Sequence, residues 1–74
     1  MKKEKVTILD NISGEIRRRG MTQDDLCELL GIERKTYSNW KSKGEMPATK
    51  LLKCAIIFNC SVDYLVRDVD VSTS

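Results

Sequence analysis

Apolar residues recur at three- and four-residue intervals along the chain, in short runs separated by glycine or proline. This spacing places them on one face of an α-helix, whereas the alternation typical of a strand is present only weakly, over residues 66–71. Thr7 and Thr22 each precede an aspartate by three residues, which is the pattern of a capping box at a helix start. The pattern therefore predicts an all-α protein.

The spacing divides the chain into a compact domain of five predicted helices. They cover residues 8–19, 23–30 and 33–42, a segment from Pro47 to about Asn59, and a short stretch capped by Ser61 that holds Val62, Tyr64 and Leu65. We expect inward faces from Leu26, Leu29 and Leu30 in the second helix and from Tyr37 and Trp40 in the third, with Ile32 filling the turn between them. The fourth helix carries Leu51, Leu52, Ala55, Ile56 and Phe58.

Residues 22–40 carry the most informative part of the pattern. Two short amphipathic helices are joined there by a turn of three to four residues at Gly31, which permits a positive φ. Cys27 provides a small side chain where the two helix axes must approach closely. This combination predicts a helix-turn-helix, a motif whose second helix can lie in the major groove of DNA.

The third predicted helix has one outward polar stripe, formed by Arg34, Lys35, Ser38, Asn39 and Ser42. Arg34 can donate two hydrogen bonds to O6 and N7 of guanine, and Asn39 can pair with N6 and N7 of adenine. Lys35 and Ser38 can reach base acceptors or phosphate. We therefore predict base contacts from Arg34, Lys35, Ser38 and Asn39.

Other polar residues are expected along the sugar-phosphate backbone, namely Thr22, Gln23, Lys41, Ser42 and Lys43. Gln23 opens the second helix, where backbone N–H groups and the helix dipole favour a phosphate. Lys41 and Lys43 follow the stripe and bring positive charge to the backbone. Each of two basic segments has two interpretations. Residues 17–19 are a solvated helix end or a phosphate contact, and Lys2, Lys3 and Lys5 are an arm on DNA or a disordered terminus.

The 74 residues suffice for one small domain, with 13 Lys and Arg against 11 Asp and Glu and a net charge of +2. The charge is unevenly distributed. Residues 1–20 hold six bases against three acids, residues 21–31 hold three acids and no base, and residues 32–43 hold four bases against Glu33. Two basic blocks that flank an acidic helix are typical of a protein with one face turned to a polyanion.

The composition gives little support to other functional classes. Cys27, Cys54 and Cys60 lack metal-ligand spacing and are accompanied by no histidine, so we expect buried reduced thiols and no metal site. Without a nucleophile–base pair or a glycine-rich phosphate loop, we expect no enzyme, no cofactor and no small-molecule substrate. No apolar run approaches the roughly 20 residues that cross a bilayer, and no signal region is evident, which predicts a cytoplasmic protein without membrane contact.

A set of framework positions spans both halves of the chain. They are Gln23, Leu26, Cys27, Leu30, Gly31, Ile32, Tyr37, Trp40, Pro47, Leu51, Leu52, Ala55 and residues 58–65. Through them the chain resembles the lambdoid phage repressor and Cro-like helix-turn-helix family, over about residues 8–66. Glu33 departs from that family, which often has serine at this helix start, and it is a weaker N-cap than serine.

The resemblance implies a lambda-repressor-like fold and a sequence-specific transcriptional regulator of the phage-repressor type. Such a protein binds double-stranded DNA as a homodimer on a two-fold operator, with helix 33–42 in the major groove, in a bacterial or phage-infected cell. It acts by occluding polymerase. The resemblance also implies that Gln23 contacts phosphate and buttresses helix 33–42.

We divide the chain into a basic N-terminal arm (1–7), a helix-turn-helix domain (8–66) and a C-terminal tail or linker (67–74). Apolar residues are also present near the end of the chain, namely Leu65, Val66, Val69 and Val71. They form part of a dimer surface, cover the fourth helix, or lead into a further domain. The alternative function is a protein-interaction module, such as an antitoxin or a regulatory partner. That function needs an exposed apolar patch, for which only residues 65–71 are candidates, whereas the bases at positions 34, 35, 41 and 43 favour nucleic acid.

Overall fold

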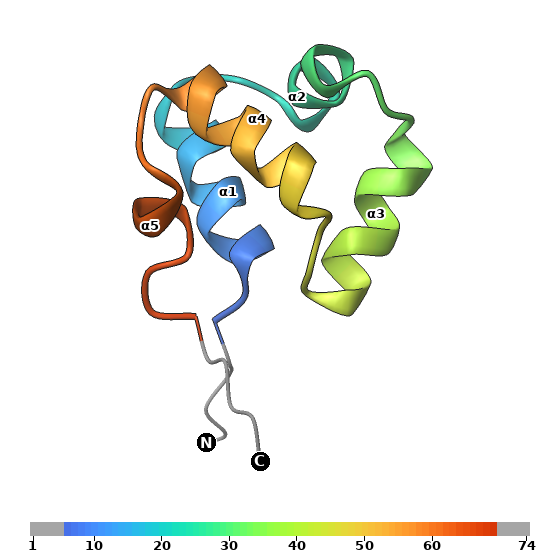
Figure 1. The fold of residues 1–74 in the computed structure, drawn as a ribbon. Coiled ribbons are helices and arrows are strands. Elements are labelled where there is room, and N and C mark those ends of the chain that lie inside the picture. The colour runs from blue at the N-terminus through green and yellow to red at the C-terminus, as the bar shows by residue number, and fades with distance from the viewer. Residues whose placement is uncertain (1–5, 70–74) are drawn as a thin grey trace.

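The computed structural model describes residues 6–69, which form five helices and no strand (Figure 1). The helices are α1 (Ile8–Arg18), α2 (Gln23–Leu30), α3 (Arg34–Lys43), α4 (Ala48–Phe58) and α5 (Val62–Leu65). The predicted all-α architecture is confirmed, and helix ends differ from expectation by no more than one residue. The weak alternation near the C-terminus forms no strand as far as Val69, and residues 70 and 71 lie outside the described part. Within residues 6–69, no helix is both long and apolar enough to traverse a bilayer.

Both predicted capping boxes are present. Thr22 Oγ1 accepts a hydrogen bond from the Asp25 N–H at 3.1 Å, and the Asp25 carboxylate accepts one from the Thr22 N–H at 3.0 Å. Thr7 and Asp10 make the same pair of bonds at the start of α1. These bonds satisfy backbone donors that have no partner inside the helix, so each helix begins where the sequence predicts. Gly31 ends α2 in the left-handed conformation, with φ of 70°.

The core lies where the five helices meet and is filled by Leu9, Ile12, Ile16, Leu26, Cys27, Leu30, Tyr37, Leu51, Cys54, Ala55, Phe58 and Leu65. The prediction for Leu29 is wrong, because this side chain is 51% exposed. The buried face of α2 is centred between Leu26, Cys27 and Leu30, and Leu29 lies about 100° around the helix from that centre. On α4, Leu52 and Ile56 are also exposed, at 54% and 71%.

The cysteines are free thiols, and Cys27 and Cys54 are buried while Cys60 is partly buried. Burial, together with a smaller contribution from the nearby Cys60, raises the pKa of the Cys54 thiol to about 11. A thiol with so high a pKa carries almost no thiolate at neutral pH and is correspondingly unreactive. The expectation of buried reduced thiols is therefore confirmed for Cys27 and Cys54.

The segment after α5 is fixed to α1 by side-chain bonds. Asn11 Nδ2 donates hydrogen bonds to the carbonyl oxygens of Leu65 at 2.8 Å and Arg67 at 2.9 Å. Arg67, predicted to begin the tail, thus lies against the domain. Leu65 is fully buried in the core, so it has no surface to offer a partner and must be removed from the candidate dimer contacts. Val66 and Val69 are half-buried, and Val71 lies outside the described residues.

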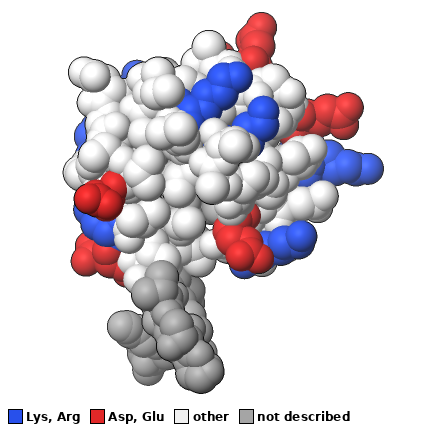
Figure 2. All heavy atoms as spheres, viewed as in Figure 1, with Lys and Arg blue, Asp and Glu red and all other residues white. Residues whose placement is uncertain are grey.

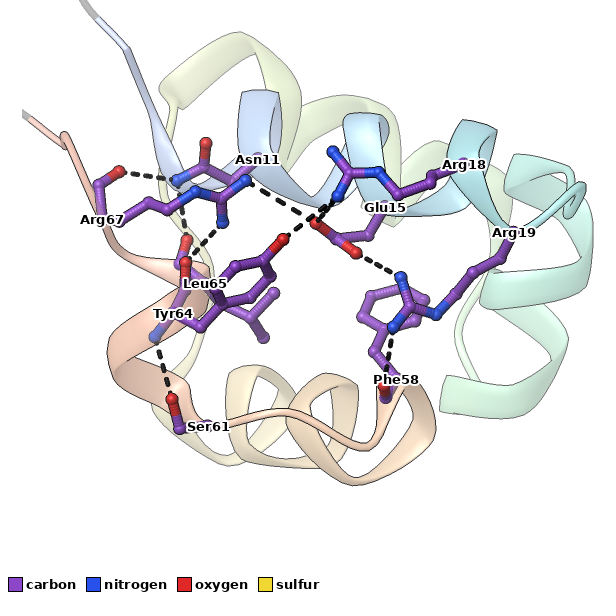
Figure 3. Close-up of polar contacts among 9 residues, drawn as sticks. All are labelled: Asn11, Glu15, Arg18, Arg19, Phe58, Ser61, Tyr64, Leu65 and Arg67. Atoms are coloured by element: carbon purple, nitrogen blue, oxygen red, sulfur yellow. Dashed lines mark hydrogen bonds and ion pairs between the residues drawn. The ribbon is translucent and has the colours of Figure 1, made fainter.

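A buried carboxylate joins α1 to the C-terminal segment (Figure 3). Glu15 is 1% exposed and pairs with Arg18 at 3.0 Å, with Arg67 at 3.6 Å and with Arg19. Arg19 Nη2 also donates to the carbonyl oxygen of Phe58, at 2.8 Å, and Arg18 Nη1 donates to Tyr64 Oη, at 3.1 Å. We call Glu15, Arg18, Arg19, Tyr64 and Arg67 the Glu15 cluster. It connects α1 to the end of α4 and to α5.

The Glu15 cluster keeps its carboxylate charged. Burial raises the pKa of Glu15, but hydrogen bonds from Tyr64 and Arg19 and the positive charges of Arg18 and Arg19 outweigh burial and hold the pKa below 4.5. Two of the three basic residues that the sequence left open at positions 17–19 are therefore engaged inside the domain. Of these three arginines, only Arg17 makes no ion pair with another described residue.

Candidate nucleic-acid interface

The exposed helix α3 is attached to the domain through two aromatic side chains. Tyr37 is 1% exposed, and Trp40 is partly buried against the core. Their rings lie edge to face, with centroids 6.3 Å apart and planes inclined by 63°. Ile32 is also partly buried at the turn before the helix. Tyr37 is the one fully buried residue of α3, so the helix is held from behind and lies at one edge of the domain (Figure 1).

The nine residues predicted to contact DNA are all exposed: Thr22, Gln23, Arg34, Lys35, Ser38, Asn39, Lys41, Ser42 and Lys43. They come from the start of α2 and from α3, two helices that contact each other. The Thr22 hydroxyl already serves the capping box. The structure thus assembles the predicted residues around one helix-turn-helix.

A hollow of about 300 Å³ lies between the end of α1, the start of α2 and the end of α3. Its walls include Arg17, Thr22, Gln23 and Lys41. The hollow therefore places two cationic side chains beside the N-terminus of α2. The sequence left two interpretations for Arg17, and its place in this wall distinguishes it from Arg18 and Arg19, which pair with Glu15.

Arg34 is held by an acidic residue of α2. Its Nε donates to Asp24 Oδ1 at 2.7 Å, and its Nη2 lies 3.4 Å from Asp24 Oδ2. Both side chains are exposed, at 71% for Arg34 and 64% for Asp24. The hydrogen bond and charge of Asp24 raise the pKa of Arg34. Sequence analysis did not predict this pair. The signal available in the sequence was the acidic segment 21–31, which comes just before the basic helix α3.

The start of α3 lacks a side-chain cap. Glu33 occupies the N-cap position with an extended backbone but makes no capping hydrogen bond, which agrees with the expectation that glutamate is a weaker N-cap than serine.

Lysine, arginine, aspartate and glutamate side chains are mixed along the edge where α3 lies (Figure 2). Positive and negative side chains are thus interspersed on this surface. Such a surface favours contacts between individual side chains and bases more than unspecific attraction to any polyanion.

A family model for the bacteriophage CI repressor helix-turn-helix domain matches residues 11–70 of the chain. The chain belongs to this family. No match was found among curated proteins or among solved structures. As a CI repressor helix-turn-helix domain, the protein is a DNA-binding phage repressor domain with a lambda-repressor-like fold, in which α2 and α3 form the motif. The resemblance stated from the sequence is confirmed.

Proposed function

We propose that this CI repressor helix-turn-helix domain is a sequence-specific repressor that places α3 in the major groove of double-stranded DNA. The observation that carries the proposal is the exposed polar stripe of α3, held from behind by Tyr37 and Trp40. In a helix-turn-helix, the N-terminal part of the second helix contacts base edges. Arg34, Lys35, Ser38 and Asn39 occupy that part and carry the donors and acceptors that base edges require.

The hollow beside α2 is the proposed seat of one phosphate. The capping box takes the N–H groups of Thr22 and Asp25, which leaves those of Gln23 and Asp24 without a partner inside the helix. Arg17 and Lys41, in the walls of the same hollow, add positive charge. A phosphate there would fix the register of α3 in the groove while Ser42 and Lys43 follow the backbone.

We further propose that two copies bind a two-fold operator. A single module of this size buries only about 600–1,000 Å² on DNA, so useful affinity requires pairing. Two-fold symmetry would set the α3 helices about 34 Å apart, one helical turn of DNA. Val66 and Val69 are half-buried and remain the described candidates for a pairing surface.

One observation favours the alternative of a protein-interaction module. Leu52 and Ile56 lie one turn apart on α4 and expose 54% and 71% of their surface, outside the segment in which an apolar patch was expected. Selection of bound sites from random double-stranded DNA decides between the two functions. Enrichment of a two-fold sequence supports the repressor, and failure to enrich any sequence at low salt would favour the alternative.

Replacement of Arg34 or Asn39 by alanine is expected to relax base preference at one position of the half-site each. A good pairing between a side chain and a base discriminates by about 1–3 kcal/mol, so preference there should fall by roughly 5- to 150-fold. Competition binding with single-base variants of the selected site measures this. Lys53→Ala on α4 is the matched control, because Lys53 is exposed but lies outside the helix-turn-helix. Unchanged base preference in both α3 variants would show that neither Arg34 nor Asn39 contacts a base.

Lys43→Ala is expected to weaken binding to every sequence equally. If Lys43 neutralises one phosphate, its loss reduces the slope of log affinity against log salt by about one unit. Titrations of one duplex at four or more salt concentrations give that slope. Lys53→Ala removes the same charge elsewhere and should leave the slope unaltered. Equal slopes for Lys43→Ala and the parent protein would show that Lys43 does not touch the backbone.

A further inference from the structure

We propose that Asp24 is a specificity-determining positioning residue, which holds the Arg34 guanidinium so that its outer edge meets a guanine. The inference rests on the proposed base-reading role of Arg34. It adds a residue of α2 that itself contacts no base, and it assigns to the acidic helix a function that its charge alone does not explain.

The geometry of the pair leaves one edge of the guanidinium free. Asp24 accepts hydrogen bonds from Nε at 2.7 Å and from Nη2 at 3.4 Å, the two nitrogens on one side of the Arg34 guanidinium. The other edge, formed by Nη1 and the second hydrogen of Nη2, still has two parallel donors. Two parallel donors are what O6 and N7 of guanine accept. Arg34 can therefore bind Asp24 and a guanine at the same time.

Asp24 differs from the other acidic residues of α2. Asp25 is occupied by the capping box, and Glu28, one turn further along, forms no ion pair within residues 6–69. The pair with Arg34 joins two side chains that are both more than half exposed. Exposed ion pairs contribute little to the stability of a fold. An effect of Asp24 should therefore be sought in how Arg34 binds.

Two consequences follow for binding. An arginine side chain that moves freely in solvent must lose rotamer freedom when it docks on a base. A side chain that a neighbouring residue already holds in place loses less. The carboxylate also offsets part of the positive charge that would attract any phosphate. Asp24 should therefore increase the preference of Arg34 for its base and lower the affinity for unrelated DNA.

The test uses the full chain and the site selected from random DNA. Asp24→Ala, Glu28→Ala, Arg34→Ala and the double variant Asp24→Ala/Arg34→Ala are compared on duplexes that differ at single base pairs. Glu28→Ala is the matched control, because it removes one carboxylate from the same helix without touching Arg34. Asp24→Asn keeps an acceptor oxygen for Arg34 Nε without the charge, and thermal unfolding of each variant verifies that it is folded.

Asp24→Ala is expected to lower preference at the base pair sensitive to Arg34 by about fivefold and at no other pair. Glu28→Ala should not change it, and Asp24→Asn should retain most of it. In the Arg34→Ala background, loss of Asp24 should have no further effect on base preference. A folded Asp24→Ala protein that keeps full preference at the pair read by Arg34 would overturn the role of Asp24 while leaving that of Arg34 intact. If Arg34→Ala itself leaves every preference unchanged, the base-reading role fails first, and this inference fails with it.

Discussion

Tyr37→Ala is expected to cost about 3–5 kcal/mol of unfolding free energy, which is the usual cost of replacing a large buried aromatic residue by alanine. Tyr37 is the one buried residue of α3 and is 1% exposed. Small domains have total stabilities of about 5–15 kcal/mol, and one of this size is expected near the lower end. The variant should therefore be largely unfolded at physiological temperature, and DNA binding should disappear with the fold. Circular dichroism during thermal and urea unfolding measures the loss.

Tyr37→Phe provides the control, because it keeps the ring and removes only the hydroxyl. Among the described residues, the buried Tyr37 Oη has no hydrogen-bond partner that meets normal geometry. Burial raises the pKa of Tyr37, and the nearby Ser13 hydroxyl offsets only part of this. Removal of an unsatisfied buried polar group should leave stability unchanged or raise it by up to about 1 kcal/mol. Equal losses in Tyr37→Phe and Tyr37→Ala would mean that the hydroxyl, and not the ring, anchors α3.

Local sequence chemistry accounts for the parts of the fold that were predicted well. Thr22 and Asp25 start α2 with bonds that span three residues, and Gly31 ends it with a conformation that glycine adopts readily. Tyr37 and Trp40 are expected on one inward face because they are three positions apart on a helix. Signals of this kind depend only on near neighbours in the chain, so they can be read before any fold is known.

The features that sequence reasoning missed all depend on contacts between elements. Glu15 is buried because Arg67 and Tyr64, about fifty residues away in the chain, complete its surroundings. Asp24 reaches Arg34 only because of the angle between α2 and α3. Leu29 was expected inside because leucine is apolar, but it lies to one side of the face that Leu26, Cys27 and Leu30 bury. Residue type and spacing do not determine such choices.

The Glu15 cluster lies apart from α3, the helix that we propose to contact DNA bases. The Glu15 cluster links α1 to the end of α4 and to α5, whereas α3 lies at the opposite edge of the domain (Figures 1 and 3). Arg17 is next to Arg18 in the chain but faces the hollow beside α2. The C-terminus of α1 thus faces both sides of the domain, because Arg17 lines the hollow while Arg18 and Arg19 pair with Glu15.

Glu15→Ala is expected to lower the unfolding free energy by about 2–3 kcal/mol. Removal of one partner from a buried ion pair commonly costs about 3–5 kcal/mol, because the remaining charge is left uncompensated. The cost is smaller here, since Arg18, Arg19 and Arg67 are 56%, 34% and 35% exposed and can turn partly to water. For a domain of this length, the loss corresponds to a fall in Tm of roughly 10–20 °C. Differential scanning calorimetry checks it.

Glu15→Gln separates the charge from the shape of the side chain and gives the prediction a pH dependence. The pKa of Glu15 in the folded domain is below 4.5, so its charge stabilises the fold at neutral pH. This stabilisation is lost as the pH falls below 4.5 and the carboxylate is protonated in the folded state. The parent protein should therefore exceed Glu15→Gln in Tm at pH 7, and the gap should close as the solution is acidified. A gap that stays constant down to pH values well below 4.5 would show that the cluster contributes through packing alone and not through the charge of Glu15.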